Sequence, residues 1–292
     1  MIYNGVKITL RLLLLEVIVL ILASYISIYT AEYIGEYPSM LIAQLFIFIP
    51  IGRGLIFLSK THEYAPLHEL IGLKGFDYGI IFIILLLPAS AQNAATLIFS
   101  PIAEPLTRLF GEQMDIASPQ TVSEFLWLFA NLCIVAPIME ELLFRGVIMQ
   151  ILKPHGTAAA LFISSFGFAL LHFSPAAFLI ILVVGIVIGL VRIYSDSIFP
   201  CILFHSLFNL QSLMLLVFEA EIENNFMLSG IYILGTALLF PVLFFAMYKL
   251  YGKGKWLKGS IKGCKGGKIS LFLTIIIYAL ISAVSFYSIN MK

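Results

Sequence analysis

The chain has 292 residues, of which 61% are hydrophobic and only 11% are charged, and its mean hydropathy is +1.05. Soluble domains are about 45–50% apolar and about 25% charged, so a water-soluble globule of this size could not bury so much apolar surface, and we expect a multi-spanning membrane protein. The formal net charge of +1, from 17 basic and 16 acidic residues, argues against a nucleic-acid-binding protein.

Nine segments are long and apolar enough to be membrane-spanning helices, which need about 20 mostly apolar residues. The first segment lacks the small-residue cleavage pattern of a signal peptide, so we expect a retained helix. The predicted fold class is all-α, a polytopic transmembrane helix bundle of eight or nine spans that forms a single membrane domain over residues 1–292. In chain order the predicted spans are 9–30, 38–58, 78–99, 121–151, 157–173, 176–194, 198–217, 228–249 and 269–288.

The charges in the loops indicate on which side of the membrane each loop lies. With a cytoplasmic N-terminus, alternating spans place loops 59–77, 152–156, 195–197 and 250–268 inside, and these loops hold most of the lysines. The outer loops hold acidic residues and Arg108 as their single base. This distribution follows the positive-inside rule, so we expect a multi-pass protein of a bacterial cell membrane with a cytoplasmic N-terminus. The outer acidic residues are Glu32, Glu36, Glu104, Glu112, Asp115, Glu219, Glu221 and Glu223.

Residues 249–268 form a lysine-rich stretch that has many glycines and no acidic residue. We expect a cytoplasmic loop that helps to set the topology, and contact with anionic lipid headgroups is the alternative interpretation. Membrane lipid is therefore one expected partner of the chain.

The fourth predicted span carries Glu140, Glu141 and Arg145 well inside residues 121–151, where charges are unfavourable by several kcal/mol. Glu141 and Arg145 are four residues apart, in the order that favours an ion pair on a helix. Glu140 points about 100° away and has no such local counter-charge. A carboxyl group at this depth must be protonated, solvated in a cavity or paired from another helix, and burial suits it to act as a general base. The alternative is a charged cluster that only fixes helix packing.

Two further spans bring polar side chains into apolar surroundings. The fifth ends with His172, and the seventh holds His205 and Asn209 on one face at i, i+4. At about 1.5 Å per residue, Glu140 and His172 lie roughly 18 Å and roughly 22 Å from the inner ends of their helices, Asn209 at roughly 16 Å and His205 at roughly 10 Å. We expect these groups from three helices to share one catalytic cavity in the inner half of the membrane. For any single histidine, a packing role is the alternative.

Three ordered motifs carry a family resemblance: Glu140-Glu141-x-x-x-Arg145, Phe168-x-x-x-His172 and His205-x-x-x-Asn209. Together they resemble the CPBP family of intramembrane metalloproteases, the CAAX-protease and bacteriocin-processing group also called Abi, which includes type II CAAX prenyl endopeptidases. Gly185 and Gly189 and the turn at 194–200 agree with the same pattern. The resemblance covers about 135–212, and we assign a CPBP-like catalytic core to residues 121–217.

This resemblance implies an intramembrane endopeptidase that hydrolyses a peptide bond in a membrane-associated peptide or protein. Carried over residue by residue, Glu140 would activate the hydrolytic water with help from His172. His205 and Asn209 would bind that water or polarise the scissile carbonyl. Glu141 and Arg145 would be the structural pair beside them. The substrate would be of the CAAX type or of the bacteriocin or signal-peptide type.

The residues leave the cofactor open. Glu140, His172 and His205 resemble the His₂Glu ligand sets of some catalytic zinc sites. Asn209 is a better oxyanion donor than a zinc ligand, and His205 is predicted to lie furthest from the other groups, so a metal-free mechanism is slightly preferred. The three cysteines lie far apart with no C-x-x-C pair, and no H-E-x-x-H motif is present.

A second class of function uses the same polar pocket without catalysis. The chain would then be a membrane transporter or a bacteriocin self-immunity protein that holds a ligand there. Transporters often contain internal repeats and broken helices. No internal repeat is evident, although Pro50, Pro88 and Pro137 are expected to kink their helices. The intact set of motif residues favours catalysis.

Overall fold

The computed structural model describes residues 2–61, 66–110, 118–218, 222 and 225–252. Within this part of the chain the regular structure is entirely helical, and seven helices are long and apolar enough to cross a membrane. The shorter apolar helix Thr157–Leu170 supplies the eighth of the nine predicted segments. The prediction of an all-α polytopic bundle is therefore confirmed, and the chain is an integral membrane protein. The ninth predicted span, 269–288, and nearly all of the lysine-rich stretch lie outside the described residues.

Most of the α-helices are joined by short turns or by shifts of helical register. Two stretches of wider, π-type helix, Phe129–Val135 (η1) and Leu142–Ile148 (η2), interrupt the helix that corresponds to the fourth predicted span. The α-helices are α1 Ile2–Ile34, α2 Glu36–Leu45, α3 Phe48–Thr61, α4 Leu67–Leu70, α5 Ile80–Ile84, α6 Leu87–Phe110, α7 Val122–Leu128, α8 Ala136–Glu141, α9 Met149–Leu152, α10 Thr157–Leu170, α11 Phe178–Ser195, α12 Phe199–Val217 and α14 Phe226–Met247.

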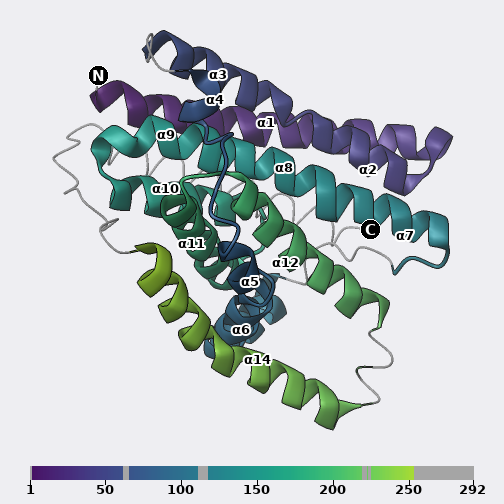
Figure 1. The fold of residues 1–292 in the computed structure, drawn as a ribbon. Coiled ribbons are helices and arrows are strands. Elements are labelled where there is room, and N and C mark those ends of the chain that lie inside the picture. Colours follow the sequence, from purple (N-terminus) through teal and green to yellow (C-terminus); the bar gives the residue numbers. More distant parts are fainter. Residues whose placement is uncertain (1, 62–65, 111–117, 219–221, 223–224, 253–292) are drawn as a thin grey trace.

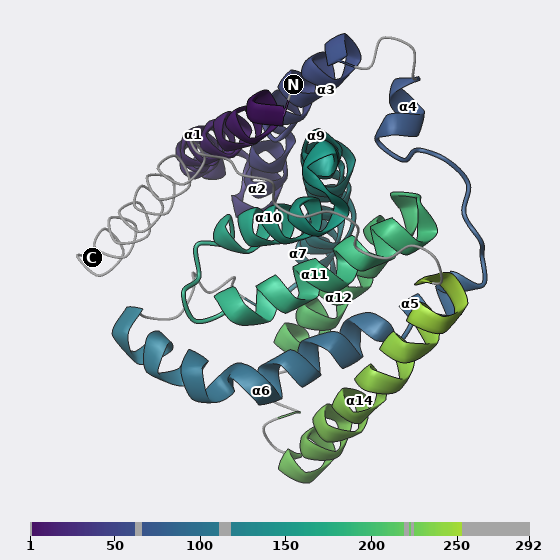
Figure 2. The same cartoon turned by 90° about the vertical axis from the view of Figure 1, so that its left-hand side faces the viewer.

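The helix α7–α9, which runs without a turn from Val122 to His155, is the central element of the bundle. On one side it contacts α1, α2 and α3, and on the other it contacts α10 and α12 (Figure 1). Beyond them, α11 packs against α10, α12 and α6, and α14 covers α6. Figure 2 shows the same order, with α1–α3 on one side of the molecule and α6 with α14 on the other. The fourth predicted span is therefore enclosed by helices on both sides.

The two ends of the bundle can be named by residues of this central helix. Its last turn lies beside the start of α1, since a side chain at Gly5 would touch the Ile151 carbonyl and the His155 ring. We call this the Lys153 end and the opposite one the Thr121 end. The turn between α11 and α12 and the segment that precedes α5 lie toward the Lys153 end, since a side chain at Gly146 would touch Ile198 and Ile71 and Gln150 donates to the Leu70 carbonyl.

Prolines break two of the predicted spans, as expected. The second is divided into α2 and α3 at Phe46 and Ile47, just before Pro50. The third is divided into α5 and α6 at Leu85 and Leu86, just before Pro88. A proline lacks the N–H that would bond the carbonyl four residues earlier, and its ring clashes with that carbonyl. Each break therefore lies in the turn that the proline disrupts.

The fifth predicted span is shorter than expected. Residues 157–173 are predicted as one helix, but α10 ends at Leu170 and the chain turns before α11 begins at Phe178. Phe173 adopts a φ of 50°, a left-handed conformation that is rare for a residue with a bulky side chain. His172 therefore lies on a turn inside the bundle, two residues beyond the helix that was predicted to carry it.

A charged cluster fastens the segment before α5 to the turn between α11 and α12. Lys74 forms an ion pair with Asp196, which also accepts a hydrogen bond from Arg192 at 3.3 Å. The Ser197 hydroxyl donates to the Lys74 carbonyl at 2.7 Å. Partial burial raises the pKa of Asp196, but Lys74 and Arg192 together outweigh it and hold the pKa below its usual value. The cluster is half exposed, so we expect it to fix the loop geometry and to add little stability.

Candidate active site

The ion pair predicted within the fourth span forms at the centre of the bundle. Arg145 Nη1 lies 3.0 Å from Glu141 Oε1, and both side chains are fully buried. Arg145 Nη2 donates to the Gly185 carbonyl of α11 at 2.9 Å, and the guanidinium lies 4.5 Å from the centre of the Phe168 ring. A side chain at Gly185 would lie 3.2 Å from Phe168, so glycine permits this close approach. The pair therefore connects the central helix to α10 and α11.

Glu141 also holds His205 of α12. The His205 ring is 2% exposed, and its Nδ1 lies 2.9 Å from Glu141 Oε1. Because a carboxylate only accepts hydrogen bonds, Nδ1 carries the hydrogen and Nε2 is directed away from Glu141. The sequence interpretation made Glu141 and Arg145 a structural pair beside the site. The structure adds that Glu141 orients one of the two histidines.

The predicted separation of His205 from the other groups is wrong. Its depth of roughly 10 Å assumed straight helices perpendicular to the membrane, but α12 crosses the bundle obliquely (Figures 1 and 2). His205 contacts Glu141, the neighbour of Glu140, and its charge acts on His172. Glu140, His172 and His205 therefore lie in one region of the bundle.

His172 approaches this region from the turn after α10. Its Nδ1 lies 2.8 Å from the Phe168 carbonyl, and its ring lies edge-on to the Phe168 ring at 4.7 Å. The carbonyl can only accept, so Nδ1 carries the hydrogen and Nε2 is the basic nitrogen. The charge of Glu140 acts on the imidazole, and so does that of His205. Phe168 also contacts the His205 ring at 5.5 Å, so this one aromatic side chain fixes the positions of both histidines.

Asn209 bonds a backbone carbonyl of the central helix that has no backbone N–H partner. Its Nδ2 donates to the Leu132 carbonyl at 2.7 Å. In a regular α-helix this carbonyl would accept from Ala136, but within η1 the Ala136 N–H bonds the Asn131 carbonyl instead. The residue one further along is Pro137, which has no N–H to give. Proline and the wider helix together therefore free the Leu132 carbonyl for Asn209, and such π-type stretches are frequent at functional sites.

Glu140 is half buried and interacts with residues of α2 and α1. Gln44 of α2 donates to Glu140 Oε1 across 3.4 Å. Glu16 of α1 is 2% exposed, and its charge and that of Glu140 act on each other. The sequence interpretation missed both residues. Glu16 is the single acidic residue of the first apolar segment, and the argument applied to the fourth span would have identified it.

The donor set does not fit a zinc site in this arrangement. A catalytic zinc ion needs three protein ligands at about 2.0–2.3 Å from one point. Within the described residues no three His, Cys, Asp or Glu side chains are grouped closely enough to hold a metal ion. Since both histidines use Nδ1 for hydrogen bonds, only their Nε2 atoms could face an ion. We therefore derive no step of the chemistry through a metal.

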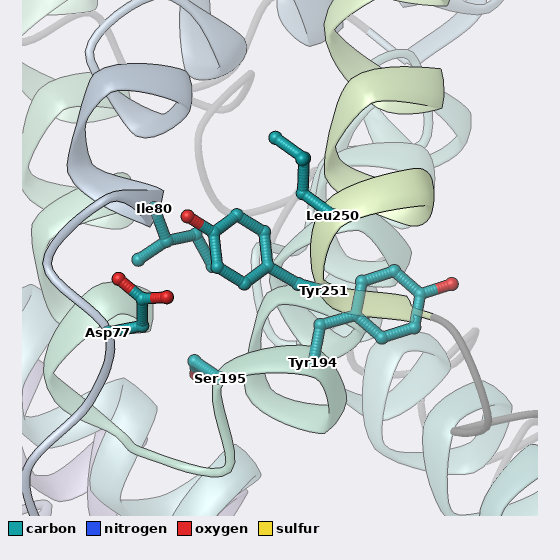
Figure 3. Close-up of a pocket in the computed structure, with 6 residues that line it drawn as sticks. All are labelled: Asp77, Ile80, Tyr194, Ser195, Leu250 and Tyr251. Carbon is teal, nitrogen blue, oxygen red and sulfur yellow. The ribbon is translucent and has the colours of Figure 1, made fainter.

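A separate cavity lies at the Lys153 end. Its volume is about 330 Å³, and Figure 3 shows Tyr251 directed across it toward Asp77 and Ile80. Tyr194, Ser195 and Leu250 complete its lining, and none of the predicted catalytic residues lines it.

The fold and this centre together define an integral membrane protein with a set of buried and half-buried acids, histidines and an amide from neighbouring parts of the bundle. Residues 122–211 match a family model described as Rce1-like, type II CAAX prenyl endopeptidase Rce1-like. The match spans just under a third of the chain, and every predicted catalytic residue, from Glu140 to Asn209, falls within it. The family resemblance of this segment is therefore confirmed, and it supports a CAAX-type intramembrane protease at the level of the family. No curated protein and no solved structure matches the chain.

Proposed function

We propose that the protein is an intramembrane endopeptidase of the CAAX type, which cleaves a peptide bond close to a lipidated C-terminus that enters the bundle from the membrane. One observation carries this proposal. Glu140, His172 and His205 come from three separate parts of an apolar bundle, yet both histidine rings pack on Phe168, His205 contacts Glu141 beside Glu140, and the charge of Glu140 acts on His172. The Rce1-like match over the same residues supports the reaction class.

In the proposed reaction, Glu140 takes a proton from a water molecule as the water oxygen attacks the scissile carbonyl. His172 Nε2 accepts a hydrogen bond from the same water and orients it. The carbonyl oxygen gains a negative charge, which His205 Nε2–H and the Asn209 amide stabilise as hydrogen-bond donors. Glu140 then returns its proton to the peptide nitrogen as the C–N bond breaks. The products are a new carboxyl group and a free amine.

The neighbouring residues fix these groups in place. Glu141 binds His205 through Nδ1, so Nε2 is directed away from this carboxylate and is the ring nitrogen placed to face the oxyanion. Phe168 supports both imidazoles, and Leu132 holds one Asn209 N–H while the other remains available for the substrate. Preorganised donors of this kind act strongly in a site that excludes water.

The same proposal assigns an orientation and partners. The Lys153 end faces the cytoplasm, because the described lysines Lys60, Lys74, Lys153 and Lys249 lie toward that end. Lipid surrounds the apolar outer surface, and the substrate is a membrane-associated peptide or protein. The reaction is proposed to need no metal, since the described residues do not form a ligand set for one.

The test uses the full chain reconstituted in phospholipid vesicles with a farnesylated peptide that ends in a CAAX sequence. We expect the wild type to release the C-terminal tripeptide. Glu140→Gln should lower kcat by about 100-fold or more, since general base catalysis contributes about 10²–10⁴. Glu32→Gln, the same change at an exposed site on α1, is the matched control and should retain full activity.

Three outcomes would contradict the proposal. Undiminished cleavage by both Glu140→Gln and His172→Ala would exclude the mechanism. Equal cleavage of a peptide without the farnesyl group would exclude a lipidated substrate and favour the bacteriocin or signal-peptide type. Ligand flux across the vesicles without any peptide cleavage would establish a transporter instead.

A further inference from the structure

Glu16 is a buried acid that forms no ion pair with any of the residues that the structure describes. The side chain lies in the middle of α1 and is 2% exposed, although α1 forms an outer helix of the bundle. Its Oε2 atom is buried and has no hydrogen-bond partner among the described residues. An isolated carboxylate in apolar surroundings is strongly unfavourable. A carboxyl group retained here without a counter-charge is therefore a candidate for function.

The packing of α1 places Glu16 at the level of the catalytic groups. Leu12 and Leu13 belong to the same buried cluster as Leu143 and Phe144 of the central helix. Leu13 also lies against Gly167 of α10. Glu16 follows these leucines by one helical turn toward the Thr121 end and therefore shares their face.

A similar step toward the Thr121 end leads to Glu140 on the central helix and to His172 just beyond the end of α10. Glu140 precedes Leu143 and Phe144 by one turn on the central helix, which runs in the opposite direction to α1. His172 follows Gly167 by five residues along the chain. The geometry of the apolar contacts therefore brings Glu16, Glu140 and His172 to the same height in the bundle.

Two carboxyl groups so placed do not both carry a charge. The field of Glu140 acts on Glu16, and like charges at short distance in a poorly solvated site strongly disfavour the doubly ionised state. Glu140 is only half buried and accepts a hydrogen bond from Gln44. Glu16 is the more deeply buried of the two, so it is the one that keeps a proton.

We propose that Glu16 is a positioning residue of the active site, a neutral carboxylic acid that donates a hydrogen bond to the Glu140 carboxylate or to the water that Glu140 activates. With Gln44 it forms the wall of the site contributed by α1 and α2, opposite the histidines. This inference rests on the proposed peptidase function, and it adds residues that lie outside the segment matched by the family model.

The decisive comparison is between Glu16→Gln and Glu16→Met. Both replacements have about the size of glutamate and carry no charge, but only glutamine can donate a hydrogen bond. We expect Glu16→Gln to cleave the farnesylated peptide with a kcat close to that of the wild type. Glu16→Met should lose about 10- to 100-fold in kcat with little change in KM, which corresponds to one hydrogen bond to a charged group. Glu32→Met, at an exposed position of the same helix, is the control.

A role in packing alone predicts the opposite order, since methionine suits an apolar site at least as well as glutamine. Equal activity of the two variants, or a loss in both, would overturn the proposal.

An infrared measurement on the same vesicles tests the protonation of Glu16 without requiring cleavage. Difference spectra between each parent and its variant cancel the ester carbonyls of the lipid. The carbonyl stretch of a protonated carboxylic acid should be lost when Glu16→Gln is introduced into the wild type or into Glu140→Gln. Difference spectra that show no loss of this band would exclude a neutral Glu16. A wild type that shows this band but cleaves no peptide would refute the peptidase function and leave the neutral Glu16 established.

Discussion

Arg145 is the residue on which the charge balance of the centre depends. Its guanidinium is the partner of a fully buried carboxylate that also binds a histidine. Arg145→Met removes the positive charge and leaves Glu141 uncompensated, and breaking a buried pair in this way costs about 3–5 kcal/mol. We therefore expect a large fall in the melting temperature of the protein in detergent, measured by intrinsic fluorescence.

The double variant Glu141→Gln/Arg145→Met tests the physical reason. It leaves no unpaired charge, so it should be much more stable than Arg145→Met alone. It should nevertheless cleave poorly, because His205 loses the carboxylate that orients it. A double variant as unstable as the single one would show that lost packing, rather than an uncompensated charge, causes the effect.

At the scale of single residues, the sequence predicts the roles that depend on spacing along one helix. The Glu141–Arg145 pair follows from an i, i+4 separation and the rarity of charges in a span. The bond from Glu141 to His205 and the approach of Gln44 to Glu140 join residues 64 and 96 positions apart. Contacts at this separation depend on how the helices cross, which no local pattern encodes.

At the scale of the elements, the π-type stretch η1 is the feature that connects local sequence to the site. Pro137 leaves one helix carbonyl without a donor, and Asn209 supplies the missing hydrogen bond from α12. The same proline therefore both shifts the helix register and anchors a proposed catalytic amide.

Pro137→Ala tests this connection. Alanine restores an N–H to the central helix and favours a regular α-helical turn. Backbone N–H groups of that turn would then compete with Asn209 for the Leu132 carbonyl. We expect a fall in kcat of about tenfold, the effect of losing roughly one neutral hydrogen bond at the site, with no fall in the melting temperature. Pro241→Ala, a like change inside α14 and away from the site, is the control. Unaltered kcat in Pro137→Ala would contradict a role for this turn in placing Asn209.

The helices themselves are largely predictable, whereas their interruptions are only partly so. Eight of the predicted spans correspond to described helices. In lipid the backbone N–H and C=O groups of about 20 apolar residues must bond one another, and a helix achieves this within a single segment. The breaks before Pro50 and Pro88 follow from proline chemistry. The early end of α10 does not, since residues 171–173 are as apolar as the helix before them, apart from His172. There the His172 ring bonds the Phe168 carbonyl four residues earlier, a side-chain contact that apolarity alone does not predict.

At the scale of the whole molecule, the arrangement of the helices explains why the centre can be polar at all. The central helix is covered by α1–α3 on one face and by α10 and α12 on the other. Charged groups thus contact protein rather than lipid, which is the condition under which they are tolerated in a membrane. Glu16 and Gln44 complete the polar lining from one side, and the histidines complete it from the other.

The orientation of this bundle in the membrane can be tested with two matched cysteine variants. Ser59→Cys lies exposed near the end of α3, at the Lys153 end, and Ser123→Cys lies exposed in the first turn of α7, at the Thr121 end. Both changes are nearly isosteric, and the native Cys133 and Cys201 are buried.

With Cys264 replaced by serine, only the introduced thiol should react. Because lysine-rich loops stay in the cytoplasm, a membrane-impermeant maleimide should label Ser123→Cys in intact cells and Ser59→Cys only after permeabilisation. The reverse pattern would place the Lys153 end outside and invert the side from which the products leave the site.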